Sequence, residues 1–156
     1  MKLGVIQGRL SEPKEGFQEC PVNWKKEFDL LSKLGLNHIE WIITHDNFHS
    51  NPIFYKDISG YSISSVCADF MVSDMFCNSA YLMKYLEPLC LAVEENNIKN
   101  ITIPLLENSS VKEKDIRDKF MKVFYPYTKE HKNINFLIEA ELHQKKLKKM
   151  LDFNNN

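Results

Sequence analysis

The stretch that decides the fold covers residues 100–140 and reads NITIPLLENSSVKEKDIRDKFMKVFYPYTKEHKNINFLIEA. It opens with the apolar run 100–106 and closes with the apolar run 134–140, and each run has the length and composition of a buried strand. Between them, residues 112–130 carry apolar side chains at helical spacing, and Pro126 is expected to distort the last turns of this helix. Strand, helix and strand in this order form the βαβ unit of a parallel sheet.

The same alternation extends through the rest of the chain. Asn23 is expected to cap the helix that follows it, Gly35 to end that helix, and Pro88 to kink or split the next one. The linker 44–61 has the length of a crossover but little helical periodicity, so we expect a loop with at most one helical turn near residues 55–58. The further strands are expected at residues 3–7, 38–43 and 62–70, and the further helices at residues 24–34, 78–97 and 142–151.

The predicted fold class is therefore α/β, with about five parallel strands and covering helices in residues 1–156, taken as one domain. Both an open doubly wound sheet and part of a barrel fit this pattern. Gly4 and Gly8 bracket the first strand, but no GxGxxG fingerprint follows it, which disfavours a dinucleotide site.

Composition and charge exclude several classes of function. The net charge is −1 and the acidic and basic residues are mixed along the chain, so we expect no nucleic-acid partner. No run approaches the roughly 20 apolar residues of a membrane span, and the apolar run at the N-terminus is too short for a signal peptide. The four cysteines show no CxxC spacing, which favours reduced thiols over a disulfide framework. The sequence predicts a soluble, cytoplasmic protein that does not contact a membrane.

Polar residues recur where the predicted strands end, which is the edge at which parallel α/β folds bind ligands. Glu139 follows an apolar run, so its carboxylate would be held rigidly at the rim, where it suits a divalent metal or acid/base chemistry. The alternative is a rim carboxylate paired with a neighbouring lysine. The candidate site residues are Gln7, Arg9, Glu40, Asp69 and Glu139.

The other polar residues also have two interpretations each. Glu40 lies inside an apolar run and faces either a site or a structural ion partner. Arg9 could bind a phosphate or sugar hydroxyls in bidentate fashion. Asp69 is either a substrate contact or the cap of a turn. His45 and His49 could ligate a metal, but histidines in loops are more often solvated.

Four segments together resemble one known family. They are GVIQGRLS at 4–11, HIEWI at 38–42, SVCADF at 65–70 and FLIEAEL at 136–142. In this order, the segments resemble the xylose-isomerase-like barrels known as sugar phosphate isomerases/epimerases.

The resemblance implies a (β/α)8 TIM barrel that binds a divalent metal such as Mn, Mg, Zn or Co. Such enzymes move a proton between adjacent carbons of a sugar or sugar phosphate through an enediol. The resemblance further implies that Glu139 is a metal ligand and a catalytic residue. It places Gln7, Arg9, Glu40 and Asp69 in substrate binding.

The sequence departs from the family pattern in two ways. The linker between the second and third strands lacks a proper helix, and a barrel of this kind normally needs about 250 residues. We therefore expect a partial (β/α)8 barrel, truncated and inactive alone. One alternative is a half-barrel that self-associates through its open sheet edges and acts as a small-metabolite binding or scaffold protein. Another is an unrelated open α/β domain that binds a small metabolite.

Overall fold

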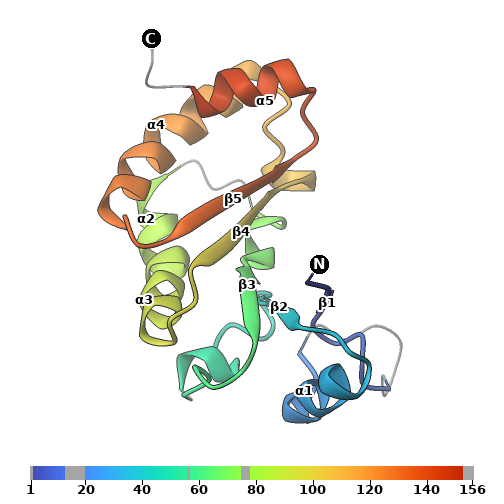
Figure 1. Ribbon diagram of the computed structural model, residues 1–156. Helices are drawn as coiled ribbons and strands as arrows, with labels where there is room; N and C mark the ends of the chain where they lie inside the picture. Colours follow the sequence, from blue (N-terminus) through green and yellow to red (C-terminus); the bar gives the residue numbers. More distant parts are fainter. Residues whose placement is uncertain (1, 13–19, 56, 75–77, 153–156) are drawn as a thin grey trace.

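The computed structural model describes residues 2–12, 20–55, 57–74 and 78–152. Its centre is a sheet of five parallel strands whose spatial order follows the order in the sequence, so the predicted α/β class is confirmed (Figure 1). The sheet is not closed, and its first and last strands are its edges. The strands are β1 (Gly4–Ile6), β2 (His38–Ile42), β3 (Ile63–Cys67), β4 (Asn100–Leu105) and β5 (Asn135–Ala140).

Helices connect most of these strands. None of the helices in the described ranges combines enough length with enough apolar character to cross a bilayer. The longer helices are α1 (Trp24–Lys33), α3 (Glu87–Glu95), α4 (Lys114–Glu130) and α5 (Gln144–Leu151). The shorter ones are α2 (Ser79–Tyr81), the π-helical turn η3 (Leu82–Leu86) and the 3₁₀ turns η1 (Pro52–Phe54), η2 (Asp69–Met71) and η4 (Glu107–Ser109).

The residues predicted to start, end or break helices lie at helix boundaries or inside helices as expected, but not all of them have the predicted effect. Asn23 occupies the N-cap of α1 without a capping hydrogen bond from its side chain, whereas Gly35 takes the left-handed φ of 69° that ends the helix. The interruption expected at Pro88 is the π-helical turn that precedes it. Pro126 does not interrupt α4, which continues to Glu130.

The β2–β3 connection contains no α-helix in its described part, as predicted, but its single helical turn lies earlier than residues 55–58. The 3₁₀ turn η1 starts at Pro52 because Asn51 caps it, with the Ile53 amide donating to the Asn51 side chain. Proline at the first helical position also favours a turn there.

The two faces of the sheet differ. One face carries the hydrophobic core: Ile39, Trp41, Val66, Ile101 and Ile103 are fully buried there, and the helices pack on it. The opposite face carries side chains of the alternate positions in the strands. We call this the polar face and define it by Glu40, Ser65, Cys67, Thr102 and Glu139.

Candidate functional site

Glu40 lies at the centre of the polar face and is held by two hydroxyl groups. Its Oε1 accepts hydrogen bonds from Ser65 Oγ at 2.9 Å and from Thr102 Oγ1 at 2.8 Å. The three residues come from the neighbouring strands β2, β3 and β4. The alternative of a structural ion pair for Glu40 is therefore wrong within the described residues, because hydroxyl groups orient this carboxylate.

A hollow adjoins Glu40 on the same face. It has a volume of about 300 Å³ and lies against β1, β2 and β3. Gly4 forms part of its wall, and the His38 ring lies where a side chain at position 4 would begin, only 2.1 Å from an ideal Cβ. Glycine at this position therefore lets the His38 imidazole pack over β1.

The negative charges of three predicted site carboxylates act on the thiol of Cys67. The pKa of Cys67 is raised, first by burial and then by the negative charges of Glu40, Asp69 and Glu139. These charges come from β2, from the end of β3 and from β5, so the fold brings together groups that lie up to about a hundred positions apart in the sequence. The result is a region of negative potential toward the carboxyl ends of the strands.

Glu139 is exposed near the end of β5, opposite Pro104 in the strand register. It makes no hydrogen bond or ion pair with any residue that the structure describes. Lys112 pairs instead with Glu141. The alternative of a rim carboxylate neutralised by a neighbouring lysine is thus wrong for Glu139 within the described ranges.

The carboxylates do not form a complete metal site on their own. Among residues 2–12, 20–55, 57–74 and 78–152, no group of three or more His, Cys, Asp or Glu side chains is close enough to hold one ion. A hard divalent cation takes six or more oxygen ligands, some of them from water. Glu139 could supply one of these ligands.

Gln7 and Arg9 lie at the end of β1. The buried Gln7 amide accepts from the backbone N–H of Ile42 at 3.0 Å and donates to Cys20 Sγ at 3.8 Å, and so ties β1 to β2. Arg9 is exposed, and its guanidinium donates to the backbone oxygen of Gln7 at 3.1 Å. Contact of either residue with a substrate stays a prediction.

Asp69 is the first residue of the turn η2. Ala68, not Asp69, occupies the N-cap position, and no side-chain capping bond forms there. Both interpretations of Asp69, as a cap of this turn and as a substrate contact, stay predictions.

Sequence reasoning missed Glu27, which holds the loop after β1. Its fully buried carboxylate accepts from the backbone N–H groups of Gly8 at 2.7 Å, Leu10 at 3.1 Å and Ser11 at 3.1 Å, and from the Ser11 hydroxyl at 3.0 Å. One signal was available: Glu27 shares the apolar stripe of α1 with Phe28. A carboxylate on that stripe must find donors in the interior.

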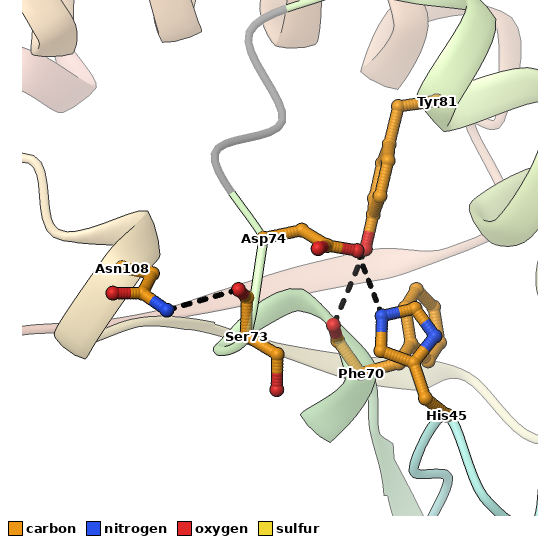
Figure 2. A network of polar contacts seen from close by, with 6 residues as sticks. All are labelled: His45, Phe70, Ser73, Asp74, Tyr81 and Asn108. Atoms are coloured by element: carbon orange, nitrogen blue, oxygen red, sulfur yellow. Dashed lines mark hydrogen bonds and ion pairs between the residues drawn. The ribbon is translucent and has the colours of Figure 1, made fainter.

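Loops that follow β2, β3 and β4 meet in a second polar cluster (Figure 2). His45 Nε2 lies 2.8 Å from Asp74 Oδ2, and the two side chains are 32% and 44% exposed. The pKa of Tyr81 is raised by burial, then by the charge of Asp74 and by a hydrogen bond with its carboxylate. Asn108 Nδ2 donates to the backbone oxygen of Ser73 at 3.1 Å, which joins the loop after β4 to the cluster.

The two loop histidines thus have different surroundings. His45 is half-buried and paired, whereas His49 is exposed and packs against the Phe48 ring. The sequence could not distinguish them, because Asp74 lies 29 positions after His45.

Cys20, Cys67 and Cys90 form no disulfide with one another, and Cys77 lies outside the described residues. The reduced state stays a prediction. Burial raises the pKa of Cys90 to about 12, so this thiol is protonated and unreactive at neutral pH.

Comparison with known proteins assigns no family to this geometry. No protein-family model matches the chain, and no curated protein matches it. A function must therefore be argued from the residues themselves.

Proposed function

We propose that this protein is sugar phosphate isomerase/epimerase-like and carries part of a site that, in a complete (β/α)8 barrel, would move a proton between adjacent carbons of a sugar or sugar phosphate with the help of a divalent metal; we expect the partial barrel to be inactive alone. One observation carries the proposal: the carboxylates of Glu40 and Glu139 lie on the polar face of a parallel sheet, and the hydroxyls of Ser65 and Thr102 orient the Glu40 carboxylate. Carboxylates at such an edge suit both hydroxyl recognition and proton transfer.

The order of the strands supports part of a (β/α)8 barrel. A doubly wound sheet reverses its strand order at a switch point and carries helices on both faces. Here the order runs without reversal from β1 to β5, and the core lies on one face. In a barrel, the polar face would line the interior and the loops after the strands would form the mouth.

Glu40 and Glu139 have distinct places in the proposed chemistry. The hydroxyls of Ser65 and Thr102 hold Glu40 in one orientation, which suits a contact with a substrate hydroxyl. Glu139 has no bond to the described residues and is exposed, so its carboxylate is available to take a proton from the carbon beside a sugar carbonyl. The electron pair of that C–H bond becomes the C=C bond of the enediol, while the carbonyl π pair moves onto the carbonyl oxygen, which receives the proton that the adjacent hydroxyl gives up. That hydroxyl oxygen becomes the new carbonyl oxygen, and return of the abstracted proton to the former carbonyl carbon completes the isomerisation.

Glu139 is the proposed ligand of the divalent metal (Mn, Mg, Zn or Co). A bound metal would supply charge stabilisation at the sugar oxygens. The described residues alone do not assemble a full ligand set for such a metal.

We expect Mn²⁺ to stabilise the protein through Glu139. At ten times its Kd, a ligand that binds only the folded state adds about 1.4 kcal/mol, which raises Tm by about 3–6 °C in a chain of this size. A thermal melt with increasing Mn²⁺ measures the shift. Glu139→Gln should reduce it strongly, while the matched control Glu141→Gln, two residues away and paired with Lys112, should keep it. An equal shift in Glu139→Gln, or none in the wild type, would remove Glu139 as a ligand.

A second candidate function is self-association as a binding or scaffold protein. Ile6 on the edge strand β1 is 43% exposed, and Leu137 on the edge strand β5 is 46% exposed. Exposed apolar side chains beside unpaired strand edges favour pairing with another copy.

For this candidate, we expect light scattering after size exclusion to give at least twice the monomer mass. Leu137→Lys should shift the protein toward the monomer, because a lysine at an edge opposes strand pairing. The control Leu34→Lys changes a 63% exposed residue at the end of α1 and should leave the mass unchanged. A wild-type protein that elutes as a clean monomer would contradict self-association.

A further inference from the structure

His45 and Asp74 form a hydrogen-bonded pair at the carboxyl edge of the sheet. His45 follows β2 and Asp74 follows η2, and the distance from Nε2 to Oδ2 is 2.8 Å. Figure 2 shows the two side chains meeting in a cluster with Tyr81. The pair is partly exposed, so a ligand at this edge can reach it.

The bond to Asp74 selects one form of the His45 ring. An ionised carboxylate only accepts hydrogen bonds, so a neutral His45 must carry its proton on Nε2. Its other nitrogen, Nδ1, then presents a lone pair, and this atom makes no hydrogen bond to any residue in the described ranges. His45 therefore offers an acceptor whose direction is set by Asp74.

Aromatic rings hold the imidazole in place. The His45 ring lies edge-on to Tyr85 at 5.2 Å between centroids and tilted against Phe70 at 6.0 Å. The Tyr81 hydroxyl donates to the backbone oxygen of Phe70 at 3.2 Å, which fixes the segment that carries this ring. A rigid acceptor at an edge is typical of a recognition group rather than of a solvated side chain.

The charge of the cluster indicates which part of a ligand it would bind. The carboxylate beside His45 repels an anion, which disfavours a phosphate at this position. A sugar hydroxyl, in contrast, donates one hydrogen bond to a nitrogen lone pair and can accept another. The pair thus fits the neutral, hydroxyl-bearing end of a sugar or sugar phosphate.

We propose that His45 is a specificity-determining substrate contact whose Nδ1 accepts a hydrogen bond from a sugar hydroxyl, with Asp74 as its positioning residue. The inference rests on the proposed function, since it takes the sugar bound at the carboxyl edge as its ligand. It adds a recognition group from the loops after β2 and β3 to the carboxylates of the polar face.

Nitrogen NMR of the whole chain, labelled with ¹⁵N in its histidine rings, tests the proposal. The His45 signals are identified by their loss in His45→Phe. We expect His45 to carry its proton on Nε2, and Asp74→Asn to populate the other tautomer, because an amide can donate to Nε2. D-Fructose and D-fructose 6-phosphate should each shift the Nδ1 signal, and inorganic phosphate should not.

Affinity provides the second measurement. We expect His45→Phe to weaken sugar binding about three- to tenfold, the loss of one neutral hydrogen bond, and the control His49→Phe to leave it unchanged. In one outcome, a sugar binds, Glu139→Gln weakens the binding, and the His45 Nδ1 signal does not shift. This outcome would overturn the His45 contact and leave the proposed function standing. A shift at His45 without any effect of Glu139→Gln would support the contact and count against Glu139. The absence of any response to either sugar would overturn both.

Discussion

Glu27→Ala is expected to lower the free energy of unfolding by about 3–5 kcal/mol, a large part of the 5–15 kcal/mol typical of a domain. The fully buried carboxylate accepts four hydrogen bonds from the loop after β1, three of them from backbone N–H groups. Alanine would leave these donors without an acceptor in the interior, where each unsatisfied group costs about 1–3 kcal/mol. Urea unfolding followed by circular dichroism measures the loss.

Two further variants separate the hydrogen bonds from general effects on helix α1. Asp29→Ala removes an exposed acidic residue two positions away and should change stability by less than about 0.5 kcal/mol. Glu27→Gln keeps one acceptor oxygen and should fall between the wild type and Glu27→Ala. A loss of under about 1 kcal/mol in Glu27→Ala would contradict the proposed role of the carboxylate in holding the loop.

The second large effect is expected at Asn51, whose side chain orders the β2–β3 connection in place of a crossover helix. Asn51→Leu should cost about 2–4 kcal/mol, because it leaves several buried groups without partners. Asn51 Oδ1 accepts from Trp41 Nε1 at 2.8 Å and from the Ile53 amide at 3.2 Å, and Nδ2 donates to the backbone oxygen of Ile42 at 3.2 Å. Chemical unfolding again gives the difference.

A double-mutant cycle isolates the bond between Asn51 and Trp41. Trp41→Phe removes the indole N–H and keeps most of the ring in the core, so Asn51→Leu should cost less in the Trp41→Phe background. The expected coupling is about 1 kcal/mol. Strictly additive losses would show that this bond contributes nothing and that the other hydrogen bonds of the Asn51 side chain account for its role.

Most of the fold could be predicted because local rules and tertiary packing agree. The five strands lie within the predicted runs because each run is short and apolar and supplies buried core residues such as Ile101 and Ile103. The 3₁₀ turn at Pro52 was misplaced by about three residues because its start depends on Asn51 as a cap. α4 continues past Pro126, which removes only one backbone N–H donor from the helix, and the next residue, Tyr127, is packed in the core.

The candidate site was only partly predictable. Position at the strand ends identified Glu40, Asp69 and Glu139, and the negative charge of each acts on the thiol of Cys67. Their partners could not be read from the sequence: the bond from Thr102 to Glu40 spans 62 positions. The pairing of His45 with Asp74 likewise depends on how two loops meet.

The sequence of residues 100–140 by itself determined a βαβ unit and, repeated along the chain, a parallel sheet. Apolar periodicity is a local property, so it specifies strands, helices and the face that each one buries. Only the tertiary structure decided that the sheet runs in sequential order from β1 to β5 and that Glu40 and Glu139 share its polar face. It also decided that the Glu27 carboxylate accepts hydrogen bonds from the loop after β1. Hydrogen-bond partners in distant segments depend on packing rather than on any local pattern.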